Sequence, residues 1–346
     1  MKFKTSVSAV AVALFLAACG GGGGSSTPSP VATVPPVAPP VTTPPVAAAD
    51  LQTSVPALTY ATSSAEYEFV TGLNQFRAQV GLGLLAQSAL LDKSARNHLD
   101  YVLKNDVLYG GQVNMRTNDP ATGRSMFHIE NASNSLFTGV QEFDRAKFVG
   151  YTGTYVGEEL AFGGGKGGAV ALTSLTATIY HRAGLMMQGL REVGVAAGTD
   201  RSQTFTLEFG YAQPQSNASD FVGVYPANNQ TGVGLFTYVE TPNPFPELST
   251  ANDDFPTKTG FPVSVIVKEN VALEVLTFTM TEAGAAVPLP GRIMTKDNDP
   301  NRYLNSNVAF FVASARLKPN TTYNVAFSGR ANNVVITKNW SFTTGA

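Results

Sequence analysis

Thr204-Phe205-Thr206-Leu207-Glu208-Phe209 is the stretch that decides the fold class of this 346-residue chain. Its polar and apolar side chains alternate one by one, which is the pattern of a strand with one buried face. Residues 192–196 (EVGVA) read as a second strand just before it. Upstream of both strands, apolar residues recur at steps of three and four, as they do in helices. Helices followed by strands predict an α+β domain built in layers.

Three helices are expected before these strands. The first covers residues 66–80, begins at a Ser/Glu capping signal and ends at a glycine. The second runs from about 88 to 104, with His98 near its apolar stripe. The third is expected over about 168–180 and places His181 at its end. Together with the two strands, these helices predict a folded domain over residues 60–218.

The rest of the chain has a different periodicity. Residues 261–267 and 323–327 alternate, Pro and Gly clusters separate the alternating runs, and no helical stripe stands out. This pattern is typical of a β-sandwich. Residues 317–323 (LKPNTTY) resemble the tyrosine corner of immunoglobulin-like (Ig-like) domains, and residues 340–344 resemble the last strand of bacterial Ig-like modules. We therefore expect a smaller Ig-like domain over 219–346, acting as a spacer or interaction module.

The first 19 residues have the pattern of an export signal. Two lysines precede an apolar run that contains no acid and is too short to span a bilayer. Residues 16–19 (LAAC) resemble a bacterial lipobox, which implies cleavage before Cys19 and lipid attachment to its thiol. Cys19 is the only cysteine, so no disulfide framework is available to this exported chain. The alternative is an ordinary signal peptide with a chance cysteine. Gly20 follows where an inner-membrane retention signal would place Asp, which favours the outer membrane.

Residues 20–59 are expected to form a disordered tether. From Gly20 to Ala49 the chain has no charged residue and is rich in Gly and Pro, so it cannot bury a core. Such a segment holds a folded domain away from a membrane. The chain without its signal has 21 basic and 25 acidic residues, a net charge of −4, and contains no basic cluster. Nucleic acid is therefore not an expected partner.

All three histidines lie between residues 98 and 181, and Glu158 stands between the last two of them. Imidazole ligates metals and exchanges protons near neutral pH, so this concentration points to a functional segment. The alternative is that His98, His128 and His181 are ordinary core or surface residues that fall together by chance.

Residues 66 to about 212 resemble the CAP superfamily, also called SCP-like, and its bacterial branch in particular. The resemblance rests on five short segments in their order and spacing: LNQFRA at 73–78, ARNHLD at 95–100, GE at 157–158, HR at 181–182 and VGV at 193–195. It implies a three-layer α-β-α sandwich with a cleft lined by two histidines and two acids. Carried over by position, these are His128, His181 and, as the first acid, Glu158.

The chain departs from the family pattern in two places. Glu159 stands where the family usually has Asn, and the helix before His181 carries no carboxylate to match the second family acid. Glu130 or Glu159 is a candidate replacement. His98 belongs to the bacterial helix pattern, and a structural role is the favoured interpretation for it.

Two functions follow as hypotheses. In the first, the chain is an envelope-anchored binding protein whose cleft holds a small ligand, a lipid or a divalent metal, with a cell-surface protein or polysaccharide as a further candidate partner. In the second, His128, Glu158 and His181 form the catalytic site of a hydrolase of peptides or cell-wall polymers. Two imidazoles and a carboxylate are also a ligand set for catalytic zinc or another divalent cation. The long spacing between the three residues requires the fold to bring them together.

Overall fold

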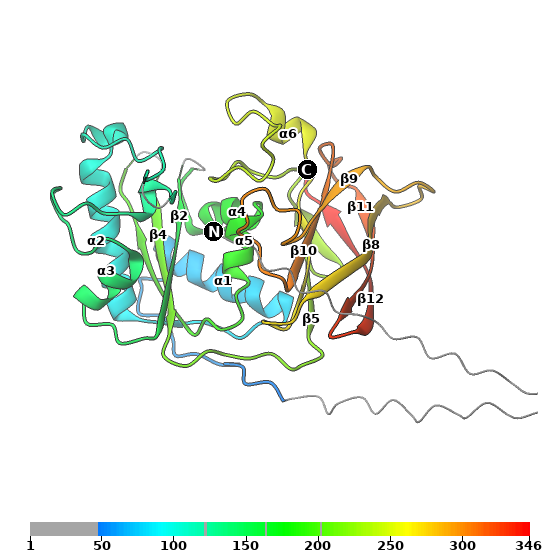
Figure 1. Ribbon diagram of the computed structural model, residues 1–346, viewed down its shortest axis with the longest axis horizontal. Helices are drawn as coiled ribbons and strands as arrows, with labels where there is room; N and C mark the ends of the chain where they lie inside the picture. Colours follow the sequence, from blue (N-terminus) through cyan, green and yellow to red (C-terminus); the bar gives the residue numbers. More distant parts are fainter. Residues whose placement is uncertain (1–47, 121–122, 163–164, 201–202) are drawn as a thin grey trace, which may run out of the picture. The chain divides into compact units, whose positions relative to one another are not determined.

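Figure 1 shows the computed structural model, which describes residues 48–120, 123–162, 165–200 and 203–346. The signal sequence, Cys19 and most of the predicted tether lie outside the described residues. The described part of the chain is mixed α and β, with six α-helices and three four-stranded sheets. The expected mixture of helices and strands is therefore present.

The first two helices begin and end close to their predicted limits. Helix α1 (Ala65–Val80) starts at Ser64, whose side chain accepts a hydrogen bond from the Tyr67 N–H, and ends at Gly81 with φ 87°. Only glycine adopts this left-handed conformation readily, so Gly81 stops the helix. Helix α2 (Ala89–Asn105) begins in the same way at Ser88.

The first sheet contains the strands on which the fold prediction rested. Its order is β1-β3-β4-β2, with β1 parallel to β3 and the other neighbours antiparallel. The strands are β1 (Ala86–Gln87), β2 (Tyr155–Ala161), β3 (Glu192–Ala197) and β4 (Phe205–Tyr211). Strands β3 and β4 match the two predicted runs, and β2 at the edge of the sheet is an addition to them.

Helices cover both faces of this sheet (Figure 1). On one face, α2 comes so close to β3 that a Cβ atom at Gly194 would lie 2.1 Å from backbone atoms of Leu91 and Asp92. Helix α3 (Glu142–Phe148) contacts both α2 and β2. On the other face, Val195 and Leu207 belong to the large buried core to which α1 and α4 contribute. The small residues of β3 therefore set the close helix–sheet packing.

The predicted third helix is broken in two. Helix α4 (Gly168–Thr176) ends before residue 177, and α5 (Tyr180–Leu185) starts after a turn, so His181 lies at the beginning of a helix rather than at the end of one. Glu240 accepts hydrogen bonds from the N–H groups of Ile179, Tyr180 and His181. A carboxylate bound to exposed N–H groups stabilises a helix start. This partner is distant in sequence, which is why the local pattern misses the break.

The C-terminal region forms two sheets, ordered β5-β7-β10-β9 and β6-β12-β11-β8. Their strands are β5 (Val222–Tyr225), β6 (Gln230–Val233), β7 (Val263–Val267), β8 (Leu273–Glu282), β9 (Gly291–Met294), β10 (Val308–Ala313), β11 (Thr322–Ala331) and β12 (Val334–Thr344). The ring of Phe278 on β8 lies 5.8 Å from that of Phe311 on β10, so aromatic side chains join the two sheets. The short helix α6 (Asp254–Lys258) interrupts the strands, and the 3₁₀ turns Val107–Tyr109 and Met126–His128 precede β2.

The predicted boundary at 218/219 lies inside one compact unit, which includes all of the described residues. The buried Arg182 of α5 joins the two regions, because it donates hydrogen bonds to the carbonyls of Thr176 and Pro262. Its guanidinium also lies 4.7 Å from the ring centroid of Phe261. A continuous set of buried apolar residues extends from α1 to β12. The two regions therefore share a core.

The predicted tether ends earlier than expected, because the chain joins the fold at Asp50. Asp50 and Ser216 exchange two backbone hydrogen bonds of 2.7 and 3.0 Å. Next to them, the Gln52 N–H donates to the side chain of Gln215, and Arg191 forms an ion pair with Asp50. Residues 50–59 thus belong to the folded unit, although their composition resembles that of a linker. In the part of the chain that the structure describes, no helix is both long and apolar enough to cross a bilayer.

The close contact at Gly194 predicts that a larger residue at this position lowers the stability of the fold. Gly194→Ala places a methyl group against the backbone of α2, and we expect a loss of about 1–3 kcal/mol in the free energy of unfolding. Gly72→Ala is the matched control, since the added methyl meets only the flexible end of Leu172 and alanine favours the α1 helix. Urea unfolding measures both variants. Equal stability of Gly194→Ala and the wild type would contradict this packing.

Candidate functional site

The edge strand β2 places two acids at the centre of the candidate site. Successive side chains of a strand point to opposite faces, so Glu158 and Glu159 face opposite sides of the sheet. Glu158 contacts side chains from α2 and α3, whereas Glu159 faces His181 of α5. Because β2 is an edge strand, a cavity beside it can be lined from both faces.

Glu158 is buried among nitrogen donors. Its Oε1 lies 2.8 Å from His128 Nδ1, and its Oε2 lies 2.5 Å from Arg145 Nη2 and 3.6 Å from His98 Nε2. Burial alone would raise the pKa of Glu158, but the Arg145 guanidinium, His98 and His128 outweigh it and hold that pKa well below its usual range. Glu158 is therefore a permanent anion that fixes the ring of His128.

Arg145 is the central cation of this cluster. Besides its bond to Glu158, its Nε lies 3.9 Å from carboxylate oxygens of both Glu130 and Glu208, and all four side chains are buried. Glu208 stands directly opposite Glu158 in the β2–β4 pair. Burial and the neighbouring Glu158 charge raise the pKa of Glu208 well above its usual range. One guanidinium thus stabilises acids from three separate segments.

His98 is part of the buried support for this cluster. Its Nδ1 lies 2.9 Å from Glu130 Oε1, and its Nε2 donates to the Phe127 carbonyl at 2.8 Å. Both ring nitrogens are therefore engaged inside the protein. This arrangement agrees with the structural role expected for His98, and it places Glu130 beside His98 rather than in the cavity.

His181 belongs to a second pair on the opposite face. Its Nδ1 lies 2.9 Å from Glu240 Oε2, and its Nε2 lies 3.7 Å from Glu159 Oε2. Burial would lower the pKa of His181, but Glu159 and Glu240 outweigh it and raise this pKa to about 9. Burial raises the pKa of Glu159 to about 8, in spite of the nearby His181. At pH 7 the pair is therefore an imidazolium and a largely protonated acid.

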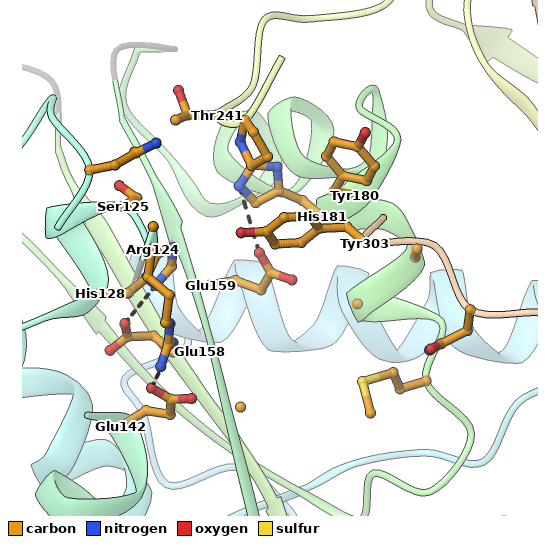
Figure 2. Close-up of a pocket in the computed structure, with 18 of the residues that line it drawn as sticks. Arg124, Ser125, His128, Glu142, Glu158, Glu159, Tyr180, His181, Thr241 and Tyr303 are labelled. Carbon is orange, nitrogen blue, oxygen red and sulfur yellow. Dashed lines mark hydrogen bonds and ion pairs between the residues drawn. The ribbon is translucent and has the colours of Figure 1, made fainter. Parts of the chain in front are cut away.

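The two pairs line one cavity of about 290 Å³ (Figure 2). Figure 2 shows His128 beside Glu158 and His181 beside Glu159, with Tyr303 extending from the C-terminal region. The His128 and His181 side chains are 23% and 18% exposed, so small molecules can reach them. Both histidines also line an adjoining cavity of about 620 Å³, which has a more apolar wall that includes Phe127, Phe162 and Phe236.

The three predicted site residues meet in this cavity, but not as one cluster. His128 is held by Glu158, and His181 is held by Glu240 and faces Glu159. Of the two candidates for the second family acid, Glu159 lines the cavity and Glu130 does not.

The predicted metal set is not assembled. Across the described residues, no group of three or more His, Cys, Asp or Glu side chains is arranged to hold a metal ion. The physical reason is that Glu158 Oε2 already binds Arg145, while His181 Nδ1 binds Glu240. Both oxygens of Glu158 are already engaged, by His128 and Arg145, so a zinc or other divalent ion would have to displace one of these partners. The two histidines use Nδ1 for their carboxylate partners and keep Nε2 as a second nitrogen donor. In this arrangement Glu158 is therefore not available as the third ligand of the set that the residue types suggested.

Sequence reasoning missed three residues of the site. Arg145 binds Glu158 and also faces Glu208, and Glu240 orients His181. Arg145 lies only 13 residues from Glu158, but no local pattern shows that the two side chains meet. Glu240 had no local signal, because it lies 59 residues from His181 in a segment expected to be a different domain.

Comparisons with known proteins give only distant similarities. No protein-family model matches the chain, and no curated protein matches it. Among solved structures, an outer surface protein from Borrelia burgdorferi is 14% identical, with a TM-score of 0.32, over 44% of this chain and 96% of that one. An extracellular protein containing an SCP domain from Bacillus anthracis str. Ames is 18% identical, with a TM-score of 0.31, over 42% of this chain and 40% of that one. At such TM-scores, neither similarity establishes a shared fold.

The environment of His181 predicts an unusual titration. We expect its imidazole to lose its proton with a midpoint of about 9, against an ordinary value of 6.5, because Glu159 and Glu240 stabilise the charged ring. The ion pair of His181 with Glu240 therefore contributes its full stability below about 6.5, and this contribution is lost as pH rises through 9. Nitrogen NMR of the three histidines measures the midpoint, and the signal absent from His181→Gln assigns it. A midpoint near 6.5 would rule out this charge arrangement.

Proposed function

We propose that the chain is an envelope-anchored, CAP/SCP-like lipoprotein that binds a small ligand in the cavity beside β2. The observation that carries this proposal is that His128, Glu158 and His181, far apart in sequence, line one accessible cavity. The volume of about 290 Å³ is near the lower end for small-molecule pockets, which span roughly 300–1,000 Å³. The polar groups that line it are held in fixed orientations.

Binding is favoured over hydrolysis by the state of the charged groups. Glu158 is fixed as an anion by Arg145, so it is a poor proton acceptor and serves instead to orient His128. His181 is likewise engaged with Glu240. Because the metal set is not assembled, metal-assisted activation of water has no support in the donor geometry. What these residues offer is a preorganised polar surface.

Several features of the fold support the finer CAP-like and Ig-like interpretation. Helices cover both faces of the first sheet, which is the arrangement of a three-layer α-β-α sandwich. In the C-terminal region, the Lys318 N–H donates to the Tyr323 hydroxyl oxygen at 2.9 Å, the kind of bond that a tyrosine corner makes. The two sheets of that region also pack against each other through aromatic residues.

The proposed location is the outer membrane, with the chain anchored through lipid on Cys19. Its support is the lipobox-like LAAC sequence and the uncharged Gly/Pro-rich segment that follows. More than one acyl chain is needed for stable anchoring, as the lipobox reading implies. The binding unit then begins at Asp50, where the chain joins the fold.

Ligand binding is tested with the Cys19→Ala chain, which carries no lipid. We expect at least one compound in a panel of amino acids, short peptides, sugars and fatty acids to raise Tm by a few degrees at saturation. His128→Ala should abolish the shift, because this side chain lines the cavity. Val287→Ala, at an exposed position in the β8–β9 loop, should retain it. A panel with no shift, or a shift that is unchanged in His128→Ala, counts against the proposal.

Lipid attachment makes a separate prediction. In a bacterial host, the wild-type chain should incorporate labelled palmitate and sediment with membranes, because Cys19 is its only thiol. Cys19→Ser should lose the label and remain in the soluble envelope fraction. Label in the Cys19→Ser chain, or soluble wild-type protein, would exclude this anchor.

A further inference from the structure

The C-terminal region forms one wall of the cavity, which gives it a role beyond that of a spacer. Four residues of this region line the cavity: Thr241, Pro242, Tyr303 and Asn305. Tyr303 and Asn305 lie in the loop between β9 and β10. In Figure 2, Tyr303 extends towards His181 and Glu159. The cavity is therefore composite, and the β9–β10 loop is placed to select what enters it.

A hydrogen-bond network fixes this loop to the helix that carries His181. The buried Asp299 accepts a bond from the Tyr180 hydroxyl, next to His181 in sequence. Asp299 also accepts the N–H groups of Tyr303 and Leu304 at 2.6 and 2.9 Å. Asn301 donates to the Tyr180 hydroxyl oxygen at 2.9 Å. These bonds fix the position of the Tyr303 backbone relative to α5.

The ring of Tyr303 is placed to contact a ligand. Its side chain lies on a fixed backbone, yet Tyr303 is 53% exposed. Its ring centroid lies 5.4 Å from that of Tyr180 at an angle of 38°, so part of the ring packs on protein while the rest borders the cavity. A rigid, half-exposed aromatic ring supplies contact area with little loss of conformational freedom.

The charges that line the cavity are matched by partners within the protein. Arg124 Nη2 lies 2.9 Å from Glu142 Oε2. His128 is paired with Glu158, and His181 with Glu240. A strongly charged ligand would have to compete with these pairs. A neutral ligand with many hydroxyl groups needs only hydrogen bonds, which the imidazoles, carboxyl groups and amides beside the cavity can supply.

We propose that the cavity binds a neutral sugar residue, with the ring of Tyr303 against the apolar face of the sugar. A pyranose ring presents C–H groups on its faces and hydroxyl groups at its rim, which matches an aromatic wall beside fixed polar groups. Tyr303 is then a specificity-determining residue, and Asp299 is the positioning residue that holds it. This inference rests on the proposed function, because it names the ligand class of the same cavity.

The test uses the full mature Cys19→Ala chain and three probes: chitotriose, maltotriose and the anionic tri-galacturonic acid. We expect at least one neutral trisaccharide to bind in isothermal titration calorimetry or saturation-transfer NMR, and to bind more tightly than the anionic one. Tyr303→Ala should raise the Kd for that sugar about tenfold, while Tyr303→Phe should change it less than about twofold, because the ring is kept. Phe148→Ala removes an aromatic side chain of similar exposure, 65%, on α3 and should leave the Kd unchanged.

The Asp299→Ala variant tests the contribution of the fixed loop separately from that of the Tyr303 ring. This variant keeps Tyr303 but removes the acceptor of the Tyr180 hydroxyl and of two loop N–H groups, so we expect weaker sugar binding with an intact Tyr303 ring. Circular dichroism and Tm show whether the variant folds. Should Asp299→Ala fail to fold, Tyr303→Ala against Phe148→Ala decides the matter alone.

The outcomes distinguish this inference from the proposed function. If no trisaccharide binds, or the anionic one binds best, while another small molecule shifts Tm in a His128-dependent way, the cavity binds ligands and the sugar inference is overturned. If a sugar binds but neither Tyr303→Ala nor His128→Ala weakens it, its site lies elsewhere and both proposals fail. Weakened binding in Tyr303→Ala and not in Phe148→Ala supports the inference.

Discussion

The buried guanidinium of Arg145 is the interaction on which the candidate site depends. It lies among acids from the segment before α3, from β2 and from β4, none of which could stay buried as an anion without a partner. Removing one member of such a cluster leaves an uncompensated charge inside the protein, which is strongly destabilising. The same guanidinium keeps Glu158 ionised, and Glu158 in turn fixes His128. Arg145 thus both balances the buried acids beside the sheet and, through Glu158, determines the orientation of the His128 ring.

The cavity owes its two-sided character to the position of β2 at the edge of the sheet. In a central strand, Glu158 and Glu159 would face separate compartments, because neighbouring strands would close both sides. At the edge, the two acids and the histidines that face them reach the same hollow. The two pairs remain electrostatically different. Arg145 keeps Glu158 ionised, whereas the pKa values of Glu159 and His181 are raised to about 8 and about 9. Glu158 and Glu159 therefore differ in their protonation because strand alternation points them to opposite faces of the sheet.

Local sequence patterns predicted the helices and strands that are determined by interactions between neighbouring residues. The starts of α1 and α2 follow from Ser64 and Ser88, which cap them, and β3 and β4 follow from alternation. The shared cavity of His128 and His181 was predictable through the family resemblance. The break between α4 and α5 was not, because the acceptor that stabilises the new helix start is a distant residue, Glu240. The predicted metal set is not assembled for a similar reason: composition shows which donors are present, but not that His128 and Arg145 already engage both oxygens of Glu158.

The entry point of the tether has a mechanical consequence. Asp50 pairs with Ser216, which lies between the last strand of the first sheet and β5, and Lys268 of the C-terminal region donates to the side chain of the same Ser216. In an anchored molecule, a pull from the membrane therefore acts first on this seam between the two regions. The load is resisted by a reciprocal backbone bridge and an ion pair before it reaches α1. If the proposed anchor holds, tension along the chain is borne first where the two regions meet at Ser216.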